Sequence, residues 1–403
     1  MEMVLEFLRD VLSQPALLIG IMSCIGLIAL KRPFHKVMTG TLKPILGYLM
    51  LAAGAGVIVN NLDPLGKMIE HGFHITGVVP NNEAIVAVAQ KVLGVETMSI
   101  LVVGLLMNLC IARFTKFKYV FLTGHHSLFM ACLMSAVLGT AGLSGMELIL
   151  VGGFLMGAWS AISPAIGQSY TSKVTDGDEI AIGHFGSLGY YLSAWVAKYV
   201  GKADDSTEDI EIPEKWGFLR DSTLSTALTM IVFYLIAAFA AGSEFVATLS
   251  GDMSPYLYAV MSAMNFAVGV TIVYSGVRMI LGDLIPAFQG IATKIIPNAI
   301  PAVDCAVFFT YAPTAVVLGF ISSFIGGIIG MLILGAVGGV LIIPGLVPHF
   351  FCGATAGIYG NATGGRRGAA VGAFLNGLAI TFLPAMALPV LGQLGFQNTT
   401  FGD

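Results

Sequence analysis

Residues 305–348 read "CAVFFTYAPTAVVLGFISSFIGGIIGMLILGAVGGVLIIPGLVP" and contain no Asp, Glu, Lys or Arg. A helix crosses the hydrocarbon core of a bilayer with about 20 predominantly apolar residues. This run is therefore long enough for two membrane spans and must be divided between them. Charge-free windows of comparable character recur along the chain at Val11–Leu30, Pro44–Leu62, Tyr119–Met146, Leu148–Ser172, Ser222–Ser243, Met253–Val277 and Gly368–Gly402.

The composition agrees with these windows. Hydrophobic residues make up 56% of the 403 residues and charged residues only 10%, whereas a soluble protein carries about 25% charged residues. The windows are much longer than barrel strands and do not alternate, so helices are the only element we expect. The sequence predicts an all-α polytopic membrane protein with about ten spans, and it excludes the soluble enzyme classes.

Basic residues indicate the orientation. Clusters of Lys and Arg at 31–43 and 113–118 follow the first and third spans, and the positive-inside rule places them in the cytoplasm. The connection at 244–252 has acids and no basic residue, so we expect it outside. The N-terminus is then outside, and it is interpreted as the start of a first span rather than as a cleaved signal peptide.

Two polar segments interrupt the apolar pattern. "VTDGDEIAIGHFG", residues 174–186, is interpreted as a cytoplasmic turn followed by a short re-entrant or interfacial segment over 180–197. The long charged loop at 198–221 is either a solvated connector or a docking surface for a soluble partner. Arg366 and Arg367, in "GNATGGRRG", mark either a cytoplasmic boundary or a contact with an anionic ligand or partner.

A short internal repeat divides the membrane domain, which we take as one unit over 1–403. "LDP" (62–64) is followed by Pro80 and Glu83, and "LIP" (284–286) is followed by Pro301 and Asp304. Five spans separate the copies, so the second copy is inverted in the membrane. We expect repeats over 11–197 and 222–403, with a substrate site near the midplane where broken segments line a cavity.

Ionisable residues in these apolar surroundings need a partner or a wet cavity, because burying one in lipid costs at least ~2.5 kcal/mol. They are interfacial residues, members of satisfied hydrogen bonds between helices, or parts of a ligand site. Imidazole and carboxylate groups together suit a ligand with several hydroxyls, and we expect no metal, no cofactor and no catalytic residue. The five cysteines are interpreted as free thiols. The residues that stand out are Glu83, His125, His126, His184 and Asp304.

Several motifs resemble the ascorbate-type IIC components of the bacterial phosphotransferase system. The resemblance runs from about residue 16 to about residue 390. It implies a homodimer in the bacterial inner membrane, built from two inverted five-span repeats, usually eleven helices, with a carrier (core) domain and a dimer scaffold. A separate IIB component, phosphorylated on cysteine by way of enzyme I, HPr and IIA, would phosphorylate the arriving sugar. The motifs are "LTGH" (122–125), "VTDG" (174–177), "IGH" (182–184), "GVRM" (276–279), "AFQGI" (287–291), "IPAVDCAVFFTYAPTAVVLGF" (300–320) and "LIIPGLVPHFF" (341–351).

The resemblance implies a sugar site but leaves the sugar open. Thr-Tyr of the family aligns with Asn82-Glu83, and its glutamines align with Phe129 and Phe185. We therefore expect a IIC subunit for ascorbate or a related sugar acid or polyol, with no catalytic role and no nucleic-acid partner. An ion-coupled secondary transporter using Glu83 and Asp304 is the alternative. The implied site residues are Gly54, Asn82, Glu83, His125, Phe129, His184, Phe185, Asp304, Pro344 and Gly345.

Overall fold

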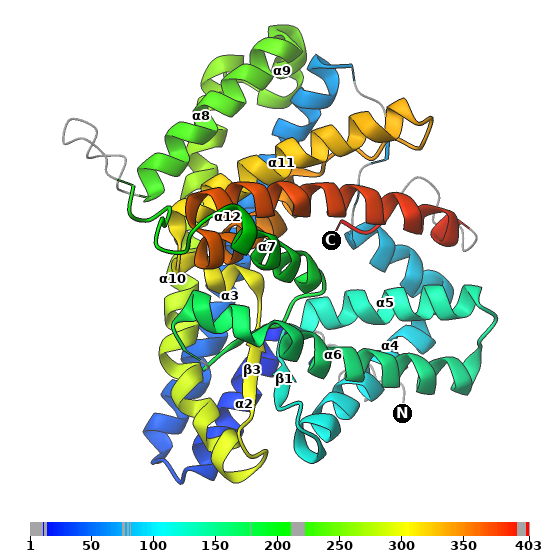
Figure 1. Ribbon diagram of the computed structural model, residues 1–403, viewed down its shortest axis with the longest axis vertical. Coiled ribbons are helices and arrows are strands. Elements are labelled where there is room, and N and C mark those ends of the chain that lie inside the picture. Colours follow the sequence, from blue (N-terminus) through cyan, green and yellow to red (C-terminus); the bar gives the residue numbers. More distant parts are fainter. Residues whose placement is uncertain are drawn as a thin grey trace.

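Helices form most of the part of the chain that the computed structural model describes, which is residues 11, 14–74, 77, 78, 80, 82–177, 179–210, 222–392 and 400–402 (Figure 1). The helices are α2 (Pro15–Ala29), α3 (Phe34–Gly72), α4 (Asn82–Phe114), α5 (Gly124–Thr140), α6 (Gly145–Thr175), α7 (Ser187–Val200), α8 (Ser222–Ala241), α9 (Ser243–Ser250), α10 (Pro255–Lys294), the 3-10 helix η2 (Cys305–Thr310), α11 (Pro313–Ala336) and α12 (Leu346–Gly392). The strands are β1 (Tyr119–Phe121), β2 (Ala181–Ile182) and β3 (Ile300–Val303).

Six of the described helices have segments long and apolar enough to cross a membrane: α3, α4, α6, α10, α11 and α12. A seventh span results if α8 and α9, bent by 117° at Gly242, are one crossing. Gly242 has a φ of 81°, which a glycine adopts without strain. The predicted all-α polytopic membrane protein is confirmed at this level, whereas ten spans and inverted five-span repeats stay predictions.

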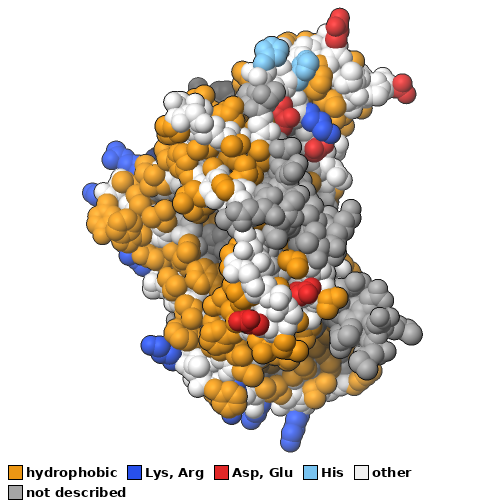
Figure 2. Space-filling view, turned by 90° about the vertical axis from the view of Figure 1, so that its right-hand side faces the viewer, with side chains coloured by type: hydrophobic (Ala, Val, Ile, Leu, Met, Phe, Trp, Pro, Cys, Tyr) orange, Lys and Arg blue, Asp and Glu red, His pale blue; other side chains and the backbone are white. Residues whose placement is uncertain are grey.

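The exterior agrees with a membrane environment. Figure 2 shows hydrophobic side chains over most of one face, with Lys and Arg at its lower and left margins. Asp, Glu and His side chains gather at its upper end together with a basic side chain, and further acidic side chains lie lower on the same face. His71, near the end of α3, stacks on Phe245 of α9 with ring centroids 3.9 Å apart. Apolar surface of this extent is expected where lipid replaces water.

The helices pack in two groups. In the first group, α3 and α10 lie against each other along much of their length, and α2, α8 and α9 pack on them. The Cβ of an alanine at Gly47 would lie 2.9 Å from the Gly276 carbonyl oxygen, and one at Gly54 would lie 2.7 Å from that of Gly269. Gly47 thus meets Gly276, and Gly54, one helical stretch further along α3, meets Gly269, which comes earlier in α10. The two helices are therefore antiparallel. Small residues allow this close approach of the two backbones.

The second group contains α4, α5, α6, α7, α11 and α12. The closest pairings are α11 with α12, α7 with α12, and α4 with α6. Ser193 of α7 donates to the Ala356 carbonyl of α12 at 2.6 Å, and Thr363 of α12 donates to the Ala194 carbonyl of α7 at 2.9 Å. Figure 1 shows α11 and α12 crossing the middle of the molecule above α5 and α6. Contacts between the two groups are fewer than those within them.

A small parallel sheet lies where the two groups meet, in the order β1-β3-β2. The prediction that helices are the only element is wrong here. Non-helical backbone is tolerated at membrane depth when it is buried in protein, and Val120, Ala181, Ile182, Ala302 and Val303 are all buried. The strands were missed because each has only two to four residues, too few for a periodic pattern.

Side-chain amides close both edges of this sheet. Asn108 of α4 donates from Nδ2 to the Tyr119 carbonyl at 3.1 Å and accepts from the Phe121 N–H at 3.0 Å, as a neighbouring strand would. Gln168 of α6 donates to the Ile180 carbonyl, next to β2, at 3.2 Å. Backbone groups that would otherwise be unpaired in a buried place are thereby satisfied.

Candidate functional site

The sheet brings three sequence motifs to one edge. Parallel strands end at the same edge, and each of these strands runs directly into a motif with a polar residue. β1 continues into "LTGHH", which starts α5; β2 continues into Gly183 and His184; β3 continues into Asp304. Residues far apart in the sequence therefore gather at the carboxyl ends of three strands, where open parallel sheets commonly bind ligands.

Gly183 allows β2 to lie against the central strand. Its N–H donates to the Val303 carbonyl at 2.7 Å. A Cβ at this position would lie 2.6 Å from the carbonyl oxygen of Ala302 and 2.8 Å from its carbon. The glycine of the "IGH" motif thus places His184 directly beside the segment that carries Asp304.

His184 is buried and held from two sides. Its Nδ1 lies 3.0 Å from the backbone nitrogen of Gly186 and 3.0 Å from the hydroxyl of Tyr190. The ring of His126, the second histidine of "LTGHH", packs on it with centroids 3.9 Å apart. The structure therefore brings the β1 and β2 motifs into direct contact, and both histidines are shielded from solvent.

Asp304 begins the turn after β3. It is 7% exposed, and one of its carboxylate oxygens accepts a hydrogen bond from the Ala306 N–H at 3.3 Å, which caps η2. The carboxylate is therefore fixed at the sheet edge by the local backbone. Tyr311 follows η2, and burial together with the nearby carboxylate of Glu179 raises the pKa of its hydroxyl.

Phenylalanines lie beside these polar groups. The ring of Phe129 is 5.6 Å from that of His126, and the ring of Phe185 is 6.1 Å from that of Phe401. Phe129 also packs in the apolar cluster that contains Phe401. At the two positions where the resembling family has glutamine, this chain thus supplies apolar rings that pack on neighbouring side chains.

A second pairing joins the two halves of the chain. Val78 and Ile342 form a parallel bridge, in which the Val78 N–H donates to the Leu341 carbonyl at 2.8 Å and the Ile343 N–H donates to the Val78 carbonyl at 2.9 Å. It brings Pro80, which precedes α4, close to Gly345, which precedes α12. A recess with about 180 Å³ of empty volume is lined there by Pro80, Ile342, Ile343, Pro344, Gly345, Pro348, His349, Ile380, Thr381 and Gly402.

Residues 401 and 402 connect this recess to the region around His184. Gly402 lines the recess, and the neighbouring Phe401 contacts Phe185. Side chains leave essentially no space in this recess even for a water molecule, so it is not a formed ligand pocket. His349 lies at its wall, with Nδ1 2.8 Å from the Ser323 hydroxyl of α11.

The predicted site residues thus fall into three places. His184, Phe185, Phe129 and Asp304 lie at or beside the sheet edge, and Pro344 and Gly345 line the recess. Gly54 lies at the crossing of α3 and α10, and its place in a sugar site stays a prediction. The side chains of Asn82, Glu83 and His125 lie outside the described part of the structure.

Three residues of this region were not predicted. Asn108 is a lone amide in an apolar helix, and that isolation was an available signal. Tyr190 could not be distinguished by sequence from Tyr191, its neighbour, and Phe401 lies unmarked near the end of the last charge-free window. Among the described residues, no group of three or more His, Cys, Asp and Glu side chains is arranged to hold a metal ion.

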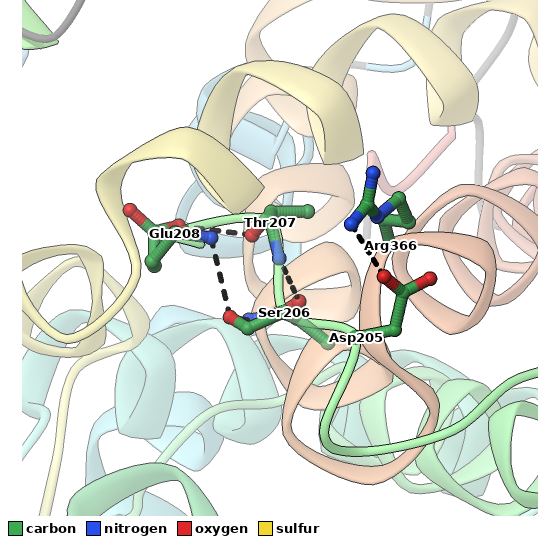
Figure 3. Close-up of polar contacts among 6 residues, drawn as sticks. Asp205, Ser206, Thr207, Glu208 and Arg366 are labelled. Carbon is green, nitrogen blue, oxygen red and sulfur yellow. Dashed lines mark hydrogen bonds and ion pairs between the residues drawn. The ribbon is translucent and has the colours of Figure 1, made fainter. Parts of the chain in front are cut away.

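The first half of the charged loop, residues 201–210, is tied to two helices by the segment 205–208, which we call the 205–208 clamp (Figure 3). Asp205 forms an ion pair with Arg366, and the Arg366 N–H donates to the Asp205 carbonyl at 2.7 Å. The contact lies where α12 breaks at Gly364 and Gly365. Gly365 has a φ of 59°, and a Cβ there would collide with the Asp205 carbonyl.

The other end of the clamp caps α11. The Glu208 carboxylate accepts hydrogen bonds from the Thr314 N–H at 3.0 Å, the Thr314 hydroxyl at 2.9 Å and the Ala315 N–H at 3.1 Å. Between the two ends, Asn361 of α12 accepts from the Thr207 N–H at 2.8 Å. Asp205, Glu208 and Arg366 are thereby engaged within the chain, whereas the second half of the loop, 211–221, lies outside the described residues.

Comparison with known families agrees with this arrangement. The sequence model of the family described as "PTS system sugar-specific permease component" matches residues 10–403. The chain belongs to this permease family. It is 28% identical over 424 aligned residues to the "Ascorbate-specific PTS system EIIC component" of Mycoplasma pneumoniae. The alignment covers 90% of this chain and 63% of that relative, so the chain spans less than two thirds of the relative's length. Membership makes the chain a membrane transport component rather than an enzyme in its own right.

Proposed function

We propose that this permease binds ascorbate or a related sugar acid or polyol and carries it across the bacterial inner membrane, for phosphorylation by a phosphorylated IIB partner. The observation that carries this proposal is the edge of the parallel sheet. There His184 and Asp304 emerge side by side from β2 and β3, with His126 against His184. Imidazole nitrogens and a carboxylate supply the donors and acceptors that several neighbouring hydroxyls require.

The proposed site contains the residues implied by the family motifs. His184, Asp304, Phe129 and Phe185 surround the sugar, and the Pro344–Gly345 break adds backbone groups. Asn82, Glu83 and His125 complete the set. Support comes from the shared sheet edge and from the recess that adjoins it through Phe401 and Gly402. Since that recess is small, the site has to open before a sugar enters.

We further propose that transport moves the second group of helices, as carrier, against the first group, as scaffold of a homodimer. Two features support this division: the groups share fewer contacts than each has internally, and α3 packs closely on α10 through paired glycines. The N-terminus lies outside, and the charged loop at 198–221 faces the cytoplasm, where IIB, supplied by enzyme I, HPr and IIA, would act.

The identity of the sugar is a separate part of the proposal. The relative's name says ascorbate, whereas the apolar Phe129 and Phe185 replace two amides, each worth ~0.5–1.5 kcal/mol net as a hydrogen-bonding group. An ascorbate anion is held well by neutral donors. An additional carboxylate at Glu83 opposes binding of the ascorbate anion, because like charges repel unless one is protonated or paired.

Two measurements on the purified protein test this function. Thermal stabilisation by ascorbate and by a panel of neutral polyols at pH 6 and pH 8 identifies the ligand. Selective stabilisation by ascorbate at both pH values contradicts the argument from Phe129, Phe185 and Glu83. Uptake into proteoliposomes containing the phosphorylated IIB component then identifies the product: phosphorylated sugar inside supports the proposal, and unchanged sugar moving with a proton or sodium gradient supports an ion-coupled transporter instead.

A further inference from the structure

The protonation state of His184 follows from one of its contacts. The backbone N–H of Gly186 points at Nδ1 across 3.0 Å. A backbone N–H can only donate, so Nδ1 must be the acceptor and carry no hydrogen. Of the two neutral tautomers, only the one with hydrogen on Nε2 satisfies this contact, and imidazolium does not. His184 therefore offers one donor, the Nε2–H.

Tyr190 contributes the second contact to the same nitrogen. Its hydroxyl lies 3.0 Å from Nδ1. Because Nδ1 carries no hydrogen, the hydroxyl is the donor in this bond. Two donors thus converge on Nδ1, one from the turn that contains His184 and one from α7. The Gly186 contact spans two positions in the chain, whereas the Tyr190 contact joins the turn to the helix that follows it.

The Tyr190 ring is well placed to fix this geometry. It is fully buried, and its centroid lies 5.3 Å from that of His184 and 5.9 Å from that of Tyr359 on α12. Tyr359 is in turn held by a hydrogen bond of 2.7 Å between its hydroxyl and that of Thr171 on α6. Side chains locked by packing hold a binding group more accurately than a loop can alone.

We propose that Tyr190 is a positioning residue: together with the Gly186 N–H, it holds His184 with Nδ1 as acceptor, so that the Nε2–H donates a hydrogen bond to an acceptor oxygen of the sugar. This inference rests on the proposed function. It fixes the direction of the contact: at His184 the sugar presents an acceptor oxygen, which a hydroxyl, a carbonyl, a ring oxygen or an enolate can supply. Tyr190 itself need not touch the sugar.

The test uses Tyr190→Phe, which keeps the buried ring and removes only the hydroxyl. Tyr191→Phe is the matched control, because Tyr191 is also buried on α7 and its hydroxyl donates to the Ser163 carbonyl at 2.9 Å instead. Nitrogen NMR of full-length protein labelled in its histidine rings reports the tautomer without any sugar, and loss of signals in His184→Gln assigns them. Equilibrium titration with ascorbate reports the affinity.

In the wild-type protein we expect His184 with hydrogen on Nε2 and with Nδ1 accepting. In Tyr190→Phe we expect the Nδ1 resonance to shift as it loses a donor, and ascorbate affinity to fall about 3- to 10-fold, as for one lost hydrogen bond. Tyr191→Phe should change neither His184 signal. A wild-type His184 with hydrogen on Nδ1 overturns the inference, and so do a spectrum and an affinity unchanged in Tyr190→Phe. Wild-type protein that binds no sugar refutes the proposed function instead, while the NMR result still decides the tautomer.

Discussion

Replacing Gly183 with alanine is expected to displace His184 and weaken sugar binding. The added Cβ would lie 2.6 Å from the Ala302 carbonyl oxygen and 2.8 Å from its carbon. Contacts this short are not tolerated, so β2 must move by several tenths of an ångström away from β3. Overpacking of a well-packed site costs ~1–3 kcal/mol. The movement also lengthens the bond of 2.7 Å from the Gly183 N–H to the Val303 carbonyl.

Gly177→Ala is the matched control, since it lies six positions earlier and no atom is within 4 Å of its added Cβ. Both variants are compared by equilibrium sugar titration and by unfolding in detergent. We expect Gly183→Ala to lose ~1–3 kcal/mol of unfolding free energy and at least about tenfold in sugar affinity, because ~1.4 kcal/mol of lost binding free energy is a factor of ten. Gly177→Ala should resemble the wild type. If the two alanine variants bind sugar equally well, the sheet does not position the site and the argument fails.

Three further predictions concern Asp304 and the charged loop. Asp304→Asn should lose at least about tenfold in sugar affinity in a titration, yet remain folded and assembled, since an asparagine oxygen can still accept from the Ala306 N–H; wild-type affinity would remove Asp304 from the site. Glu208→Ala should lower the free energy of unfolding by ~0.5–2 kcal/mol, as for a lost helix cap, with the exposed Asp209→Asn as control; equal stabilities would show that the cap contributes nothing. Reversing Asp204 and Asp209 to lysine should impair phosphorylation by IIB in proteoliposomes more than it impairs sugar binding, and unchanged phosphorylation would make this loop a connector only.

Part of the candidate site could be anticipated from the sequence because ionisable residues are costly in an apolar environment. His184 and Asp304 stand out in the sequence for that reason, and the structure places both at one sheet edge. The membrane class followed from the same physics, since uncharged runs of about 20 residues match the thickness of the bilayer core. The family motifs added Pro344 and Gly345, which the structure places at the wall of the recess.

The sheet and its supports were not predictable from local pattern. Strand pairing between residues near 120, 181 and 301 depends on contacts between distant parts of the chain, which neither periodicity nor propensity encodes. For Gly54 the local sequence is compatible with two different roles. A glycine in "AAGAG" fits both a ligand contact and a helix crossing, and the contact that the structure shows is the crossing with Gly269.

The order β1-β3-β2 also has a consequence for biosynthesis. β1 and β2 each pair only with β3, which lies roughly 120 residues after β2 in the chain. At ~5–20 residues per second, the ribosome needs ~6–24 s to reach β3 after it has completed β2. During that interval the peptide groups of the outer strands that face β3 lack their final partners, although the helices around them can already enter the bilayer. A chain halted before residue 300 would therefore lack β3 and with it the sheet edge, and the proposed sugar site could form only after that point.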